Sequence, residues 1–110
     1  MIEIKNLTKT YNNSKFEVEA IKHLNIKFKD NGFVFIVGKS GCGKSTLLNL
    51  MGGLDEVTDG DIICDGNHLV KMKEKELNNF RNNYLGFVFQ DYCLIEDLNV
   101  YENVALALDI

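Results

Sequence analysis

Residues 33–46 decide the fold, and they read Phe33-Val34-Phe35-Ile36-Val37, then Gly38-Lys39-Ser40-Gly41-Cys42-Gly43, then Lys44-Ser45-Thr46. The five apolar residues have the length of a strand that is buried on both faces. The glycine-rich stretch after them matches the G-x4-G-K-S/T phosphate loop. A helix is predicted from Lys44 to Met51, ended by Gly52-Gly53. This order of strand, loop and helix predicts a nucleotide-binding α/β core.

The residue types of this loop suit phosphate binding. Glycines let successive backbone N–H groups point inward, and the helix N-terminus adds its positive dipole end. Lys44 is predicted to reach the β- and γ-phosphates, and the Ser45 hydroxyl to coordinate Mg²⁺. The predicted nucleotide-binding set is completed by the rest of the loop: Gly38, Lys39, Ser40, Gly41, Cys42, Gly43 and Thr46.

Length and composition limit the possible functions. The chain has 110 residues, of which 45% are hydrophobic, so it can form at most one globular domain. Its net charge of -4 disfavours nucleic acid as a partner. The longest apolar runs are too short to span a membrane, and the N-terminus does not resemble a signal peptide. Three widely spaced cysteines indicate neither a disulfide framework nor a zinc site. A cytoplasmic location is therefore predicted.

The flanking segments predict a small antiparallel sheet before the loop and further α/β elements after it. Upstream, Ile2, Ile4 and Leu7 predict an edge strand, and the alternation over residues 16–28 predicts two more strands. Downstream, the pattern predicts a strand at Asp61–Cys64 with an Asp65-Gly66 turn, a helix at Lys71–Arg81, a strand at Leu85–Phe89, and a helix that Asn99 caps with Glu102. The predicted fold is a phosphate-loop core with a partial parallel sheet, beside an N-terminal antiparallel β subdomain.

Beyond the loop, the chain resembles the nucleotide-binding domain of ABC transporters over the whole of residues 1–110. Leu7-Thr8-Lys9-Thr10-Tyr11 is similar to the N-terminal strand and aromatic A-loop of that family. Gly86-Phe87-Val88-Phe89-Gln90 is similar to its Q-loop. The resemblance implies that Tyr11 stacks on adenine and that Gln90 contacts Mg²⁺, faces the membrane partner and acts with Lys44 in catalysis.

Residues 49–55 and 86–90 together resemble one branch of this family, which serves lipoprotein release, macrolide efflux and antimicrobial-peptide export. The resemblance implies an ATPase subunit that uses ATP and Mg²⁺ and couples hydrolysis to transmembrane export. It also implies a dimer with a second nucleotide-binding domain, and a permease subunit contacted near the Q-loop. Such a subunit lies at the inner face of the cell membrane.

The family's signature motif, Walker B acids, D-loop and switch histidine follow the Q-loop, and this sequence ends twenty residues after Gln90. Residues 62–65 and 87–91 each end in an acid, but such an isolated acid is typical of a turn. Residues 1–110 are therefore predicted to be the N-terminal portion of one domain, with Phe33–Val37 and Leu85–Phe89 not paired with each other. Hydrolysis would then need the missing half and dimerisation.

Three alternatives remain open at this point. The chain could be an ATP-binding fragment without turnover. A GTPase is disfavoured, because the sequence has neither D-x-x-G nor N-K-x-D. Arg81 could act as an arginine finger, although a solvated helix end is the simpler interpretation.

Overall fold

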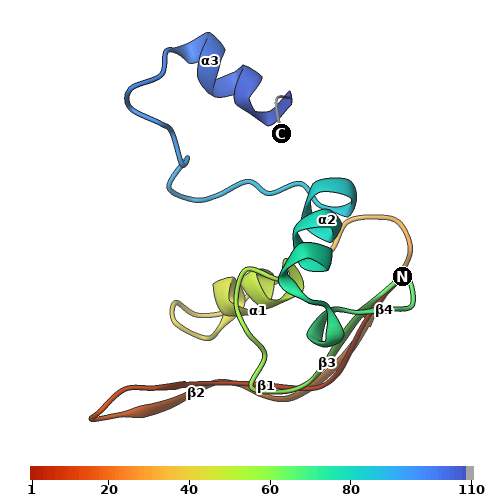
Figure 1. Ribbon diagram of the computed structural model, residues 1–110. Coiled ribbons are helices and arrows are strands. Elements are labelled where there is room, and N and C mark those ends of the chain that lie inside the picture. The colour runs from red at the N-terminus through yellow and green to blue at the C-terminus, as the bar shows by residue number, and fades with distance from the viewer. Residues whose placement is uncertain (109–110) are drawn as a thin grey trace.

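An antiparallel sheet with helices on one side forms the body of the protein (Figure 1), in a computed structural model that describes residues 1–108. The strands are β1 (Ile2–Asn12), β2 (Glu17–Phe28), β3 (Asp59–Cys64) and β4 (Asn67–His68). Their spatial order is β2-β1-β3-β4, and each neighbouring pair is antiparallel. The predicted N-terminal antiparallel sheet is confirmed.

Two details of the predicted sheet are wrong. β1 lies in the interior of the sheet between β2 and β3, not at an edge. Residues 17–28 form one strand rather than two. The register of the β1–β2 pair shifts between Ile4 and Leu7, where Asn6 has φ 49°. It shifts again between Leu7 and Lys9, where His23 of the facing strand β2 has φ 44°. Because a bulge adds a residue, the alternation stops and restarts within one continuous strand.

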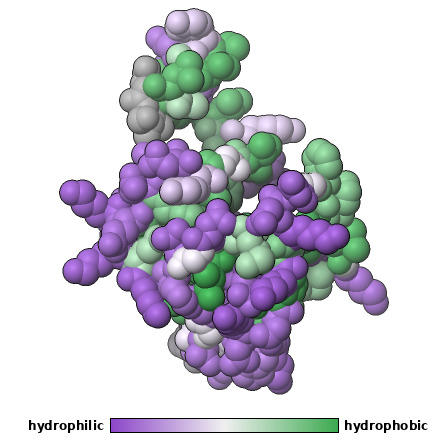
Figure 2. Space-filling view, turned by 90° about the vertical axis from the view of Figure 1, so that its right-hand side faces the viewer, coloured by the Kyte–Doolittle hydropathy of each residue, from purple (hydrophilic) through white to green (hydrophobic). Residues whose placement is uncertain are grey.

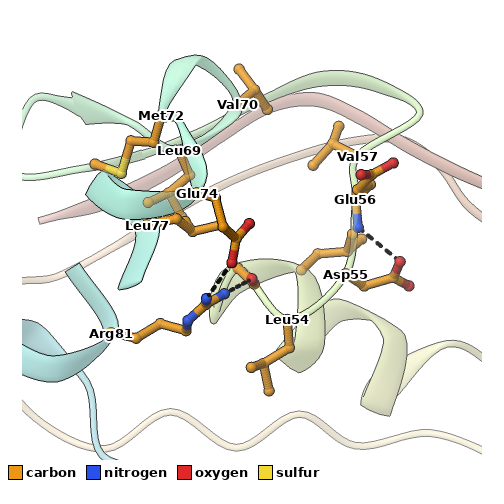
Figure 3. Close-up of a pocket in the computed structure, with 12 residues that line it drawn as sticks. Leu54, Asp55, Glu56, Val57, Leu69, Val70, Met72, Glu74, Leu77 and Arg81 are labelled. Atoms are coloured by element: carbon orange, nitrogen blue, oxygen red, sulfur yellow. Dashed lines mark hydrogen bonds and ion pairs between the residues drawn. The ribbon is translucent and has the colours of Figure 1, made fainter. Parts of the chain in front are cut away.

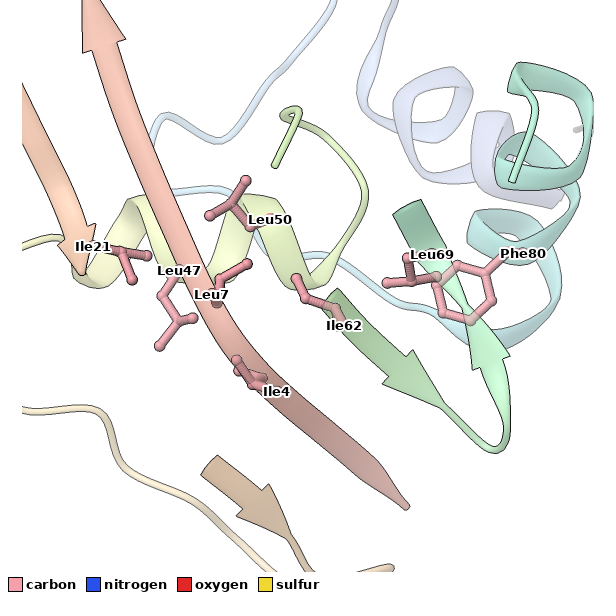
Figure 4. Close-up of a cluster of buried hydrophobic side chains, with 8 residues drawn as sticks. All are labelled: Ile4, Leu7, Ile21, Leu47, Leu50, Ile62, Leu69 and Phe80. Atoms are coloured by element: carbon pink, nitrogen blue, oxygen red, sulfur yellow. The ribbon is translucent and has the colours of Figure 1, made fainter. Parts of the chain in front are cut away.

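The helix after the glycine loop matches its prediction and packs on the sheet. Helix α1 spans Lys44–Met51, with Gly52 as its C-cap. Its buried residues Leu47 and Leu50 face apolar side chains of β1, β2 and β3. Figure 4 shows the resulting core, which contains Ile4, Leu7, Ile21, Leu47, Leu50, Ile62, Leu69 and Phe80. This core fixes the glycine loop against one face of the sheet.

The remaining helices lie after β4. They are the 3-10 turn η1 (Leu69–Lys71), α2 (Glu74–Tyr84), α3 (Val100–Ala105) and the 3-10 turn η2 (Leu106–Leu108). Helix α2 begins three residues later than predicted, because residues 69–71 form the separate turn η1. The predicted cap of α3 is confirmed: the Glu102 N–H donates to Asn99 Oδ1, and the Asn99 N–H donates to Glu102 Oε2, both at 2.9 Å.

The parallel part of the predicted sheet is not formed within residues 1–108. Phe33–Val37 and Leu85–Phe89 have no strand structure, and neither pairs with any described strand. Phe33 is 95% exposed and Val88 fully exposed. A strand requires neighbours for its backbone N–H and C=O groups, and no described strand lies beside either segment. The expectation that the two segments do not pair with each other is confirmed.

Apolar side chains are also exposed towards the C-terminus. Helix α3 has no buried residue, and it stands apart from the body at the end of an extended segment (Figure 1). In Figure 2, hydrophobic atoms cover much of the upper lobe that carries α3. Val100, Tyr101 and Val104 of α3 are each at least 70% exposed.

We expect the 110-residue chain by itself to self-associate, because exposed apolar segments with unpaired backbone groups promote aggregation. Static light scattering over a concentration series measures this association. The double variant Phe33→Glu/Phe35→Glu should scatter less than the wild-type chain. The control variant Val70→Glu, at an exposed apolar residue of η1, should not reduce it. A wild-type chain that stays monomeric throughout the series contradicts the prediction.

Candidate functional site

The glycine loop turns back on itself immediately before α1. Gly41 has φ 77° and Gly43, the N-cap of α1, has φ 95°, both in the left-handed region that favours glycine. The Cys42 N–H donates to the Lys39 carbonyl at 3.3 Å, and the Leu47 N–H donates to the Gly43 carbonyl at 2.9 Å. The loop therefore has the curled backbone that an anion-binding concavity requires.

Gly43 is also required by a close contact with the sheet. A Cβ atom added to Gly43 would lie 2.6 Å from the backbone oxygen of Ala20 in β2. This oxygen belongs to strand backbone and not to the flexible end of a side chain, so any larger residue would displace the loop. The sequence motif explains this glycine by the backbone conformation that it allows. The structure adds a second reason, the close contact with β2.

The Lys44 side chain folds back onto the first residues of the glycine loop. Its Nζ donates to the carbonyl oxygens of Gly38 at 3.0 Å and Lys39 at 2.7 Å. The third contact of the ammonium is with Cys42 Sγ at 3.7 Å. Sulfur is a weak acceptor, and a phosphate oxygen would be a stronger partner for that donor. The cation is thus held within the loop with one donor in reach of an anion.

A hollow of about 350 Å³ opens beside the loop, which we call the loop hollow. Ser45 and Thr46 line it, so five of the predicted residues, with Gly41, Cys42 and Gly43, lie together around Lys44. Gly38 and Lys39 contribute carbonyls to Lys44 instead. The opposite wall consists of Val18, Glu19 and Ala20 of β2, which the sequence analysis missed. No local motif marks them, because only strand pairing brings them to the loop.

Tyr11 lies on β1 directly across from Val18, one of the residues that line the loop hollow. The residue is 41% exposed. The Tyr11 hydroxyl donates to Asp55 Oδ2 at 2.7 Å, and Lys9 Nζ lies 4.7 Å from the ring centroid. Tyr11 thus lies across the strand pair from one residue of the loop hollow and does not itself line the hollow. The structure adds two partners of Tyr11, Lys9 and Asp55, that the sequence analysis missed.

The carboxylate of Asp55 is stabilised in its charged form. Partial burial opposes this, but hydrogen bonds from Lys9, Tyr11 and the Glu56 N–H together lower the pKa of Asp55 below its ordinary value of 3.8. The Lys9–Asp55 distance is 2.7 Å. Since the pKa is lowered on folding, these contacts stabilise the protein above about pH 4 and are lost as the pH falls further.

Gln90 is not brought to the loop hollow. It is exposed, in a turn that follows the Leu85–Phe89 segment, and within residues 1–108 it is not among the residues that line the hollow. The segment itself passes the end of α1, where the Phe87 ring occupies the space that a Cβ of Gly52 would need. Gln90 therefore does not lie beside Lys44 and Ser45 at the loop hollow, and its contact with Mg²⁺ stays a prediction.

The two acids considered for Walker B lie in turns, as expected. Asp65 adopts φ 46° in the turn between β3 and β4 and bonds to the amino group of Met1. Asp91 is exposed in the turn after Gln90. Neither lines the loop hollow as the structure describes it up to residue 108.

The interpretation of Arg81 as a solvated helix end is wrong. The Arg81 side chain is only 22% exposed, at the edge of a separate pocket of about 490 Å³ (Figure 3). It donates to the Gly53 carbonyl at 2.6 Å, to Glu74 Oε1 at 3.0 Å and to Asn78 Oδ1. Arg81 therefore ties α2 to the turn that follows α1. It does not line the loop hollow of its own chain.

The glycine loop, its lysine and the helix that follows define a phosphate-loop protein. The chain belongs to the ABC transporter family, whose model matches residues 21–109. Bacitracin export ATP-binding protein BceA of Halalkalibacterium halodurans is 40% identical over the whole chain, which covers 44% of that protein. Lipoprotein-releasing system ATP-binding protein LolD of Buchnera aphidicola is 46% identical over 92% of the chain, again covering 44% of the relative.

Solved structures show the same fold. The ATP-binding cassette MJ0796, in a dimeric post-hydrolysis state bound to ADP and Pi, is 41% identical and superposes with a TM-score of 0.92. The match covers 99% of this chain and 47% of that one. The predicted fold class, part of an ABC ATPase cassette, is confirmed, and the chain spans less than half the length of these relatives. No helix within residues 1–108 is long and apolar enough to cross a membrane.

Proposed function

We propose that this chain binds ATP as the N-terminal part of the ATP-binding subunit of an ABC transporter. One observation carries the proposal: the Lys44 ammonium is held inside the curled loop by the carbonyls of Gly38 and Lys39. A fixed cation beside a curled glycine loop and a helix N-terminus suits a polyphosphate chain. Family membership and the nucleotide named in the MJ0796 structure support the same conclusion.

Each residue of the site has a proposed role toward the nucleotide. Lys44 neutralises the β- and γ-phosphates, while the N–H groups of residues 41–46 bind phosphate oxygens. The Ser45 hydroxyl, which lines the loop hollow beside Lys44, would hold Mg²⁺ together with phosphate oxygens and water. A bound Mg²⁺ neutralises charge that develops on the phosphates. Tyr11 provides the adenine platform, and Gln90 would reach the metal once its segment is packed in a complete sheet.

We further propose that residues 1–110 are one part of a longer nucleotide-binding domain, with the A-loop, Walker A and Q-loop present. Two observations support this: the chain covers 44–47% of its relatives, and two apolar segments lack strand partners within residues 1–108. Hydrolysis then depends on the signature motif and Walker B acids of the remaining part, and on a second cassette. The dimeric MJ0796 structure supports a second cassette. The alternative is an ATP-binding fragment without turnover. The intact mass of the protein expressed from its native gene distinguishes a longer domain from such a fragment.

The names of the relatives support a transport role. BceA is named for bacitracin export and LolD for lipoprotein release, and both are at least 40% identical to this chain. We propose that the parent subunit belongs to this exporter branch, contacts a permease near Gln90 and lies at the inner face of the cell membrane.

If Tyr11 stacks on adenine, Tyr11→Ala should weaken ATP binding about fivefold. This loss corresponds to the lower end of the free energies typical of base stacking on an aromatic ring, because Tyr11 stays partly exposed. Tyr11→Phe and Tyr11→Trp should bind ATP more tightly than Tyr11→Ala, since any aromatic face can stack. Isothermal titration calorimetry of the full-length protein with ATP measures these affinities. Equal affinity of the alanine variant and the wild type would show that Tyr11 is only a strand-surface residue.

A further inference from the structure

Lys9 is a buried cation with a defined set of contacts. The residue is only 7% exposed and lies on β1, between β2 and β3. Its Nζ donates to Asp55 Oδ1 at 2.7 Å and to the Glu56 carbonyl at 2.6 Å. The same atom lies 4.7 Å from the centroid of the Tyr11 ring, within the range of a cation–π contact. Lys9 is therefore fixed by two oxygens beneath an aromatic face.

Asp55 holds both Lys9 and Tyr11. One carboxylate oxygen accepts from Lys9 Nζ and from the Glu56 N–H, and the other accepts from the Tyr11 hydroxyl at 2.7 Å. The Tyr11 ring is thus held at its edge by Asp55 and on one face by Lys9. A ring held at two points loses little conformational freedom when a ligand binds to it, which favours binding.

Asp55 is in turn anchored to the helix that begins at the phosphate loop. After α1 ends at Met51, the Gly53 N–H donates to the Leu50 carbonyl at 3.0 Å, and the Leu54 N–H donates to the Asn49 carbonyl at 2.8 Å. These bonds fix the turn that carries Asp55. One helix therefore presents phosphate-binding groups at its start and the anchor of the Tyr11 ring just beyond its end.

We propose that Lys9 and Asp55 are positioning residues for adenine recognition, which hold the Tyr11 ring with one face covered and the other open to the base. The inference rests on the proposed function of Tyr11 and adds two residues that do not touch the nucleotide. Because Lys9 occupies one face, only the opposite face can stack. Tyr11→Phe keeps Lys9 under the ring but loses the hydroxyl bond to Asp55, so this variant should bind ATP with an affinity between those of the wild type and Tyr11→Ala.

The competing explanation is structural: Lys9 and Asp55 tie β1 to the turn after α1 and have no selective effect on the base. Two ligands separate these explanations, namely ATP and inorganic tripolyphosphate, which has the phosphates but no base. Their affinities are measured by calorimetry on full-length protein for the wild type, Asp55→Asn and Lys9→Met/Asp55→Asn. The double variant avoids leaving a buried charge without its partner. Glu3→Gln and Lys27→Met serve as matched controls, since this 3.2 Å ion pair joins β1 and β2 at the other end of the strands.

We expect both Asp55 variants to lose about twofold to fourfold in ATP affinity and to keep wild-type affinity for tripolyphosphate. In a Tyr11→Ala background, adding Asp55→Asn should change neither affinity. The two control variants should bind both ligands as the wild type does.

Equal losses for both ligands would overturn the proposal in favour of a structural role, and a variant that fails to fold gives this result. Unchanged ATP affinity in both variants would also overturn it. If instead the wild type binds neither ligand, the phosphate-loop function itself is wrong and the inference fails with it. If Tyr11→Ala alone loses ATP affinity, only the positioning role is rejected.

Discussion

Lys44→Ala is expected to weaken ATP binding by roughly tenfold to more than a hundredfold. The substitution removes the side-chain cation that the carbonyls of Gly38 and Lys39 hold inside the loop. A hydrogen bond to a charged group contributes about 1.5–3 kcal/mol, and each 1.4 kcal/mol is about tenfold in affinity. The backbone amides and the helix dipole remain, so weak residual binding should persist.

The measurement is a titration of full-length protein with a fluorescent ATP analogue. Lys27→Ala is the matched control, because this exposed lysine lies on β2 and pairs with Glu3 away from the loop hollow. The control should bind as the wild type does. An unchanged dissociation constant for Lys44→Ala would reject the assignment of residues 38–46 as the phosphate site.

The second large effect concerns turnover: the 110-residue chain by itself should show no ATP hydrolysis above background. Phosphoryl transfer depends on an oriented water and on charge neutralisation around the phosphates. Lys44 and Ser45 lie at the loop hollow, but Gln90, Asp65 and Asp91 do not line it within the described residues. Glu19 of β2 also lines the hollow, but its carboxylate is paired with Lys22 at 3.9 Å. Because neither acid considered for Walker B lies there to orient the water, the site should be almost inactive rather than slow.

Phosphate release from highly purified chain tests this expectation, with Lys44→Ala purified in parallel to reveal contaminating ATPases. Equal, background-level release from both proteins is the expected result. Turnover in the wild-type chain that Lys44→Ala abolishes would show that a catalytic acid among residues 1–110 was missed.

The sequence by itself determined the local structures of this protein. The glycine loop, the start of α1 at Lys44, the Asp65-Gly66 turn and the Asn99 cap were all predicted and are present. Each depends on a few adjacent residues whose backbone preferences or short-range hydrogen bonds fix the conformation. The family could be identified for the same reason, because its motifs are short and contiguous.

Only the tertiary structure decided which distant residues meet. The interior position of β1, the contact of Arg81 with Gly53, and the group formed by Lys9, Tyr11 and Asp55 all join residues far apart in sequence. Apolar character likewise predicted strands at Phe33–Val37 and Leu85–Phe89, although a strand forms only where a partner satisfies its backbone groups. Residue type sets what a segment prefers, whereas pairing and ion contacts depend on what the fold places beside it.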